Sequence, residues 1–350
     1  QRQMCIRDRY RIFPTMYAKL KLPLGFQFTS RFTTRFDFRK RFDYEDSANP
    51  QWGHGGEVRR RHNQQTEWQF DNILNWDREF GQHRFAVTGL VNAEKIQTWY
   101  TDAQTSNLQP TEALGFHAMA LGLNPSTDSD DQVVTRTALM GRVNYVFANK
   151  YHLSGSIRRD GYSRFGSENV YGTFPSVSAA WTLTSEGFMG GAPTFISFLK
   201  LRASWGINGN SSGLNSYQAY AQLSDSKWLN WDGGYFQAPY VRLNRMANPG
   251  LSWEKNAALN FGLDYGFWDG RLRGALDVYT SETTDLLLDK RLPTVTGFEI
   301  ITTNVGNLKN TGFDLSVNAA IVKTSDFSFN SSLLVHFNKN KIVSLTGELV

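Results

Sequence analysis

The stretch Phe26–Glu45, FQFTSRFTTRFDFRKRFDYE, decides the fold because its side chains alternate in character with a period of two. Seven of its ten even-numbered positions are aromatic, and all ten odd-numbered positions are polar. A β-strand places neighbouring side chains on opposite faces, whereas a helix would mix the two sets. At about 3.3 Å per residue the strand would be about 60 Å long, much longer than the usual strand of about 5–6 residues.

The same alternation recurs along the chain and predicts about eleven strands. The further ten lie within residues 68–76, 85–93, 139–147, 151–157, 177–183, 201–207, 259–265, 272–278, 313–321 and 327–337. A twelfth strand is expected at Ala18–Leu22, before Pro23-Leu24-Gly25. There is no apolar run of the length a transmembrane helix needs. The pattern therefore predicts an all-β, antiparallel protein.

The connections between these strands alternate in length. The short ones are Glu79–His83, Ala148–Lys150, Gly266–Gly270 and Val322–Asp326, and the long ones are Asp46–Gln65, Thr101–Thr135, Asp160–Gly172, Gly209–Ser252 and Ser281–Thr303. Thr184–Leu199 departs from this order. Short turns on one rim and long loops on the other are typical of an outer-membrane β-barrel. A secreted carbohydrate-binding β protein is the soluble alternative, and it predicts that the aromatic face is buried in a core.

The two faces of Phe26–Glu45 fit a wall between lipid and water. Arg31, Arg35, Arg39 and Arg41 all fall on the polar face, as expected if an arginine at mid-bilayer costs about 2–4 kcal/mol. These inward arginines need lumen water, a plug, or carboxylates such as Asp37 and Asp43. Aromatic residues near the short turns suit an interfacial girdle: Trp76, Phe80, Tyr145, Phe147, Tyr151, Trp181, Tyr265, Phe267 and Trp268.

Composition excludes several classes of function. The net charge of +5 over 350 residues is spread along the chain, which argues against nucleic-acid binding. A single Cys excludes a disulfide framework, and the six His form no metal motif. No nucleophile-elbow or phosphate-loop motif is present, so neither an enzyme nor a cofactor or metal is expected. The acidic run Thr127–Asp131 could hold Ca²⁺ through oxygen ligands, but it lacks the spacing of a calcium loop and is expected in a solvated loop.

The two ends of the chain are predicted to be incomplete. Residues 1–9 match no later pattern and are interpreted as a non-native or artefactual leader, which leaves residues 10–350 as a partial β-barrel. The whole is interpreted as an internal fragment of a longer protein.

A long sequence motif resembles that of a known protein family. The stretch Tyr151–Gly166, YHLSGSIRRDGYSRFG, is followed by Tyr171–Trp181, YGTFPSVSAAW. Together with Leu199–Asn210, Asn248–Lys255 and Asn304–Asp314, these residues closely resemble the SusC/RagA family of TonB-dependent outer-membrane transporters. The resemblance covers roughly residues 15–350.

The resemblance implies a segment of a 22-stranded barrel whose N-terminal plug is absent from this chain. It implies location in the outer membrane of a Gram-negative, Bacteroidetes-type bacterium and uptake of oligosaccharides or peptides. The expected partners are TonB, acting through the missing part, and a SusD-like lipoprotein lid. A siderophore-type receptor without a lid is the alternative within membrane proteins, and the string at residues 158–176 favours the first interpretation.

Two sets of residues are candidate sites. The family motif comprises Arg158, Arg159, Asp160, Gly161, Arg164, Phe165, Gly172, Phe174 and Pro175. These are interpreted as locking a loop, with substrate or lid contact as the alternative. The second set lies in the longest loop and comprises Trp228, Trp231, Tyr235, Phe236 and Tyr240. Such aromatics could stack on sugars, anchor the lid, or pack within the loop.

Overall fold

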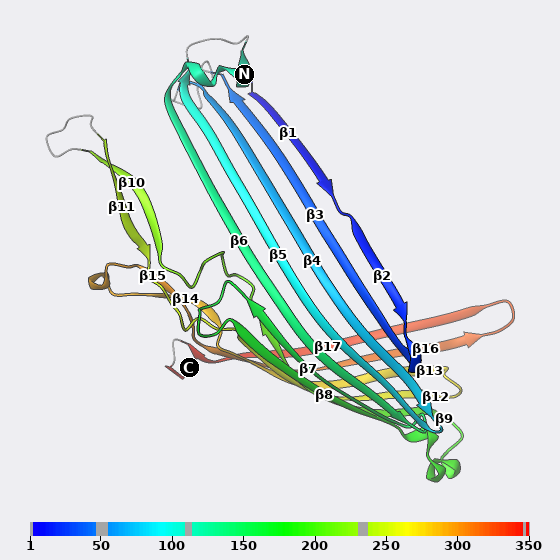
Figure 1. The fold of residues 1–350 in the computed structure, drawn as a ribbon. Helices are drawn as coiled ribbons and strands as arrows, with labels where there is room; N and C mark the ends of the chain where they lie inside the picture. The colour runs from blue at the N-terminus through cyan, green and yellow to red at the C-terminus, as the bar shows by residue number, and fades with distance from the viewer. Residues whose placement is uncertain (1–2, 47–54, 109–113, 230–236, 346–347, 350) are drawn as a thin grey trace. The chain divides into compact units, whose positions relative to one another are not determined.

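The computed structural model describes residues 3–46, 55–108, 114–229, 237–345 and 348–349. These residues form an all-β structure in which the only helices are five short 3-10 turns (Figure 1). Within the described ranges no helix has the length and apolar character needed to cross a membrane. The strands are β1 (Gln3–Ile12), β2 (Thr15–Lys21), β3 (Phe26–Glu45), β4 (Glu57–Phe80), β5 (His83–Leu108), β6 (Gly122–Phe147), β7 (Tyr151–Tyr162), β8 (Tyr171–Thr182), β9 (Ile196–Asn210), β10 (Gln222–Leu229), β11 (Gln237–Arg245), β12 (Glu254–Phe267), β13 (Leu272–Thr284), β14 (Leu287–Arg291), β15 (Ile300–Asn304), β16 (Asn307–Lys323), β17 (Ser328–Leu345) and β18 (Glu348–Leu349).

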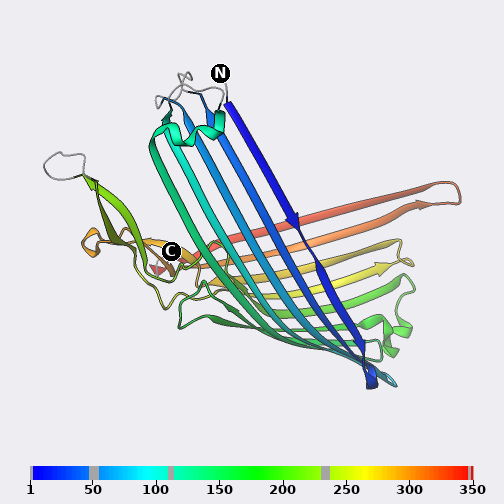
Figure 2. The ribbon, with the colours of Figure 1, turned by 45° about the horizontal axis from the view of Figure 1, so that its top comes forward.

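Fourteen of the described strands form one sheet in nearly sequential order. The order is β1-β3-β4-β5-β6-β7-β8-β9-β12-β13-β16-β17-β18, with β2 also paired to β3. Neighbours such as β12 and β13 are antiparallel, with Phe261 opposite Val278. Figure 2 shows β3 to β6 as adjacent long ribbons. The prediction of an antiparallel barrel wall is confirmed, and all eleven predicted strands and the twelfth, β2, are present.

The sequence interpretation is wrong about the length of several strands. The expected loop Thr101–Thr135 is largely strand, because β5 continues to Leu108 and β6 begins at Gly122. The acidic run Thr127–Asp131 therefore lies within β6 and not in a loop. Two further long connections contain hairpins of their own, β10–β11 and β14–β15.

The start of the chain also differs from the expectation. The sequence interpretation excludes residues 1–9 from the fold, yet Gln3–Ile12 forms β1, which pairs with β3 so that Tyr10 lies opposite Phe38. The non-native origin of residues 1–9 stays a prediction. The short turns agree with expectation: Ala148 and Asn149 both have positive φ, as a tight two-residue hairpin requires.

The chain divides into two compact units. The first comprises Gln1–Leu20, Thr29–Asn72 and Asn92–Thr137, and the second comprises Lys21–Phe28, Ile73–Val91 and Ala138–Val350. In the second unit, the apolar side chains that alternate along the strands are exposed rather than buried. Leu153, Val177 and Phe261 are each more than half exposed. The soluble alternative predicted that such residues would form a core, and the structure contradicts it.

The aromatic girdle follows the short turns of the second unit. Phe147 stacks on Tyr151, and Tyr151 stacks on Trp181, with ring centroids 6.1 and 6.2 Å apart. The irregular connection Thr184–Leu199 holds two 3-10 turns and places Phe188 against Trp181. Stacked aromatic rings at strand ends are typical of a membrane interface.

Candidate functional site

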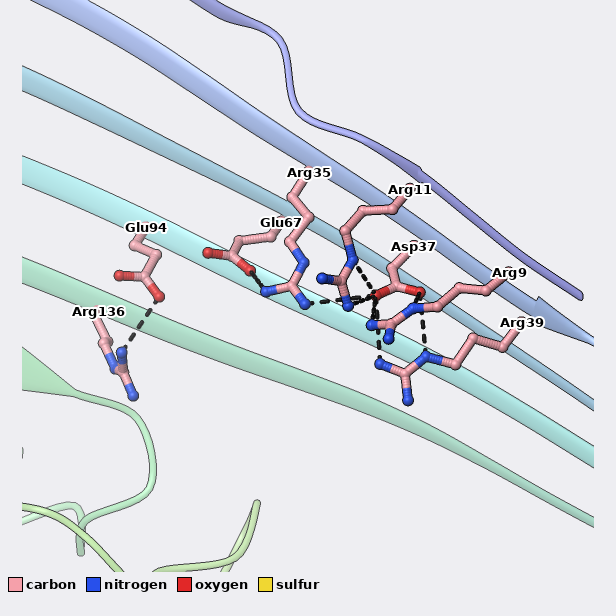
Figure 3. Close-up of polar contacts among 8 residues, drawn as sticks. All are labelled: Arg9, Arg11, Arg35, Asp37, Arg39, Glu67, Glu94 and Arg136. Atoms are coloured by element: carbon pink, nitrogen blue, oxygen red, sulfur yellow. Dashed lines mark hydrogen bonds and ion pairs between the residues drawn. The ribbon is translucent and has the colours of Figure 1, made fainter.

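Asp37 in β3 is the centre of the largest charge cluster on the polar face of the first unit. Its carboxylate accepts hydrogen bonds from Arg9 and Arg11 of β1 and from Arg35 and Arg39 of β3 (Figure 3). The shortest nitrogen–oxygen distances to these arginines run from 2.6 Å for Arg9 to 3.5 Å for Arg35. Only 2% of Asp37 is exposed. One carboxylate thus holds four guanidinium groups, and the cluster keeps an excess of positive charge.

The neighbouring contacts reduce that excess only in part. Arg35 also lies 3.5 Å from Glu67 of β4, and Arg41 pairs with Asp43 at 2.7 Å. Of the partners expected for the inward arginines of β3, namely lumen water, a plug or carboxylates, the structure shows the carboxylates Asp37 and Asp43.

A second cluster of the same kind surrounds Asp102 of β5. Arg59 and Arg61, both from β4, donate to its carboxylate, each at a distance of 2.9 Å. The Tyr100 hydroxyl donates to it at 2.8 Å. Burial opposes ionisation of Asp102, but the hydrogen bonds from these three residues outweigh it, so the pKa of Asp102 lies well below its ordinary value. Asp102 is therefore ionised at neutral pH and holds two arginines in place.

Sequence reasoning missed the Asp102 cluster because it placed this part of β5 in a loop. The arginines at positions 59 and 61 repeat, on one face of a strand, the even spacing of Arg35 and Arg39, which is the signal that could have found them. Their meeting with Asp102 depends on the pairing of β4 with β5, which spacing alone does not reveal.

A polar cavity lies beside the Asp37 cluster and reaches Tyr100 of the Asp102 cluster. It measures about 280 Å³, and its lining includes Asp37, Arg39, Asn63, Thr98, Tyr100, Asp130 and Gln132. A second cavity of about 410 Å³ shares Arg39 and Asn63 and adds Arg61. A further cavity of about 930 Å³ is in the second unit and is lined mainly by apolar side chains of the outward parity, such as Leu153, Phe261 and Val278. It belongs to the apolar face of the strands.

The second unit has an ion cluster of opposite composition. Arg202 of β9 donates to Asp264 of β12 at 2.9 Å and to Asp277 of β13 at 3.0 Å. Gly262 makes this possible, because a Cβ atom there would lie 2.7 Å from the Arg202 guanidinium and 2.7 Å from an oxygen of Asp277. Here one arginine joins three strands and is shared by two carboxylates.

The family motif forms the core of a loop assembly in the second unit. Phe165, next to the buried Tyr162, packs on Trp253 with ring centroids 4.5 Å apart, and Phe174 meets the same Trp253 at 5.4 Å. The backbone N–H of Gly166 donates to the carbonyl of Leu251 at 3.0 Å. Phe165 and Leu251 are fully buried. The segment between β7 and β8 is therefore packed against the segment that precedes β12.

The remaining motif residues lie around this core. Arg158 pairs with Asp160 at 2.8 Å, and the Arg159 guanidinium lies 5.0 Å from the centroid of the Tyr171 ring. Arg164 donates to the carbonyl of Leu214. Gly172 has no room for a Cβ atom beside Phe174 and Trp253. In the β7–β8 ladder Gly161 lies opposite Tyr171, and Pro175 lies opposite Ile157.

The aromatic set of the longest loop is only partly described. Trp228 lies in β10 and Tyr240 in β11, while Trp231, Tyr235 and Phe236 lie outside the described residues. The base of this hairpin is tied down by Arg245, which donates to the carbonyl of Tyr217 at 2.7 Å. The structure does not bring the five aromatic side chains together as a described site.

Comparison with known proteins identifies the family to which this β-sheet belongs. The family described as TonB dependent receptor-like, beta-barrel matches residues 7–347. The chain belongs to this family. Its barrels are outer-membrane proteins, and its receptors work with TonB.

The relatives of this TonB-dependent receptor segment are much longer. TonB-dependent receptor P26 of Formosa agariphila is 33% identical over 331 residues, which are 91% of this chain and 32% of the relative. TonB-dependent receptor SusC of Bacteroides thetaiotaomicron is 36% identical over 218 residues, which are 61% of this chain and 21% of SusC. The chain thus spans about a third or less of the length of these relatives, and the resemblance to SusC is confirmed.

Solved structures show the same fold. The structure described as the RagAB peptide transporter matches with a TM-score of 0.87 at 23% identity, over 98% of this chain and 37% of that one. The siderophore receptor PiuA from Acinetobacter baumannii matches with a TM-score of 0.55 at 12% identity, over 97% of this chain and 48% of that one. The fold is therefore closer to RagAB than to this siderophore receptor.

Proposed function

We propose that this chain is part of the barrel wall of an outer-membrane importer that takes up oligosaccharides. One observation carries the proposal: a single sheet exposes large apolar side chains on one face and holds ion clusters on the other. Lipid requires the first face, and a water-filled path for polar cargo requires the second. The host is proposed to be a Gram-negative, Bacteroidetes-type bacterium.

The proposed partners act at the two ends of the transport path. TonB supplies the energy through a plug in the longer protein. A SusD-like lipoprotein covers the long-loop end, and the β10–β11 hairpin, with Trp228 and Tyr240 on its strands, is the proposed contact for lid or substrate. The likeness to SusC supports a lid partner. The family-motif residues are proposed to hold the loops in place, because Phe165 and Phe174 are buried against Trp253.

Peptides are the second candidate cargo, because the similar RagAB structure is described as a peptide transporter. The proposed function includes no catalytic step, metal or cofactor. A siderophore-type receptor without a lid is less well supported, since its fold likeness is weaker.

The experiment is to express the full-length gene product in a Bacteroidetes host and to follow its location and transport. We expect recovery with the outer-membrane fraction and growth on oligosaccharide that is lost when TonB or the neighbouring SusD-like gene is deleted. Recovery in the soluble fraction would reject the importer. Growth on oligosaccharide that needs TonB but not the lid gene would argue against the lid partner and leave the importer standing.

A further inference from the structure

On the polar face of the first unit, three carboxylates hold a larger number of arginines. Leaving Arg9 aside because it falls within the predicted leader, five arginines converge on this face: Arg11, Arg35, Arg39, Arg59 and Arg61. They share three carboxylates, those of Asp37, Asp102 and Glu67. We call these eight residues the arginine wall. Its net charge is positive although each arginine is held in place.

The geometry leaves donors for a further anion. Within the described residues, Arg39 binds Asp37, and Arg61 binds Asp102, through Nε and Nη2. A guanidinium has five N–H groups, so Nη1 of each arginine remains for another acceptor. The five side chains are between 27 and 48% exposed, whereas Asp37 and Asp102 are buried beneath them. The carboxylates orient the arginines, and the arginines face the solvent.

The arginine wall extends beyond the part of the strands that lipid can cover. On the outward parity of β4, the apolar residues Phe70 and Trp68 give way to Thr66, Gln64, His62 and Arg60. A cation on that face cannot lie in hydrocarbon without a cost of about 2–4 kcal/mol, so Arg60 lies beyond the edge of the lipid. Arg59, Arg61 and Asp102 lie on the long-loop side of this edge, where cargo arrives from outside.

The cavity beside these arginines favours a saccharide over a peptide. Apart from Tyr100, its lining is charged, amide or hydroxyl: Arg39 lies with the carboxylates of Asp37 and Asp130, and Asn63, Thr98 and Gln132 are among the uncharged groups. Such groups bind sugar hydroxyls, and the Arg61 guanidinium lies over the Tyr100 ring, 5.7 Å from its centroid. A peptide of mixed sequence would bring aliphatic side chains, for which this cavity has no apolar lining.

We propose that the arginine wall binds the acidic groups of an anionic oligosaccharide during uptake. The ligand chemistry is an oxyanion, either a uronate carboxylate or a sulfate ester, bound by Arg39 and Arg61, which both line the cavity of about 410 Å³. This inference rests on the proposed import of oligosaccharides and names the class of cargo. Guanidinium groups suit it because they bind such oxyanions through two parallel hydrogen bonds.

The test uses the full-length protein, purified in detergent, and isothermal titration calorimetry. The probes are an oligogalacturonide, a sulfated galacto-oligosaccharide, a neutral galacto-oligosaccharide of the same length and a glutamate-rich peptide. The variant is Arg39→Gln with Arg61→Gln, because Asp37 then keeps Arg11 and Arg35, and Asp102 keeps Arg59. We expect about 10- to 100-fold weaker binding of the anionic saccharide, the size of one or two lost charge-assisted hydrogen bonds.

A matched control removes two arginines elsewhere. Arg84→Gln with Arg271→Gln lowers the net charge equally at exposed positions near the short turns. It should leave anion binding within about twofold of the wild type, since exposed charges are screened by salt. Replacement of Arg39 and Arg61 by Lys should restore part of the affinity, which a merely structural role would not predict.

The outcomes separate the inference from the proposed function. Selective loss of uronate or of sulfate binding supports the proposal and identifies the acidic group. Equal loss of neutral and anionic binding, or binding of the glutamate-rich peptide alone, overturns it. TonB-dependent growth on neutral oligosaccharides without any binding of anionic probes overturns the inference while the importer stands. The absence of TonB-dependent growth on any saccharide overturns both.

Discussion

The Asp37 cluster of the first unit and the Arg202 cluster of the second unit have opposite compositions. In the first unit, the buried Asp37 is surrounded by four arginines. In the second unit, Arg202 is shared by Asp264 and Asp277, and Asn260 donates to Asp277. The first cluster has an excess of positive charge. The second has one cation for two anions.

This difference indicates different roles for similar contacts. The Arg202 cluster joins β9, β12 and β13 by direct ion pairs, and Arg202 and Asp277 both lie opposite Gly262 of β12, the strand between them. The Arg202 cluster therefore stabilises the pairing of these three strands. The Asp37 cluster holds more cations than it needs for pairing, and these lie around polar cavities. Asp37 stabilises the sheet through its ion pairs, and the remaining positive charge of the cluster is proposed to bind an anion.

The largest effect is expected for Asp37→Asn. The variant removes the negative charge at the centre of four arginines, and the loss of a buried charge partner costs about 3–5 kcal/mol. Urea unfolding of the full-length protein in detergent measures the loss. Asp43→Asn is the control, since Asp43 pairs with the exposed Arg41 and its loss should cost less than about 1 kcal/mol. Added sulfate should restore part of the stability of Asp37→Asn, and equal stability of both variants would refute the central role of Asp37.

Arg202→Met should have a smaller effect, about 1–3 kcal/mol, because Asp264 and Asp277 retain some contact with solvent. Urea unfolding of the full-length protein in detergent again measures the loss of stability. Adding Asp264→Asn and Asp277→Asn should restore most of the loss, because the unpaired charges disappear. Added sulfate should not restore the stability of Arg202→Met, which distinguishes this cluster from that of Asp37. A triple variant no more stable than the single one would argue against a charge effect.

Gly262→Ala tests whether the Arg202 cluster depends on close strand packing. The new methyl group would lie 2.7 Å from both Arg202 and Asp277, so the side chains must shift, at a cost of about 1–2 kcal/mol. Gly155→Ala in β7 is the matched control, because no heavy atom lies within 4 Å of its Cβ position. Equal urea midpoints for the two variants would show that the cluster tolerates the displacement.

The sequence predicts the strands wherever one face meets lipid. Phe26–Glu45 is predicted with its observed bounds because phenylalanines recur at every second or fourth position on one face. The end of β5 and the start of β6 are missed because both faces of these strands are polar there. In the segment Thr127–Asp131 of β6, for example, Asp128 and Asp130 alternate with residues that are polar as well. Period-two hydrophobicity disappears where water lies on both sides of a strand.

The ion clusters were predictable only within one strand. Asp37 lies two residues from Arg35 and Arg39, so their common face follows from the period of the strand. Asp102 meets Arg59 and Arg61 from another strand, and Asp264 meets Arg202 across a ladder. Those contacts depend on register, which the turns and the complete sheet determine.

The smallest effect is expected for Arg158→Gln in the family motif. Arg158 pairs with Asp160 at the surface, with 44% of its side chain exposed, so the free energy of unfolding should change by less than about 1 kcal/mol. By contrast, Phe165→Ala should destabilise the loops, since Phe165 is buried against Trp253. If the motif only holds the loops, Arg158→Gln should leave TonB-dependent growth on oligosaccharide unchanged. Lost growth at unchanged stability would instead assign Arg158 to the surface that contacts substrate or lid.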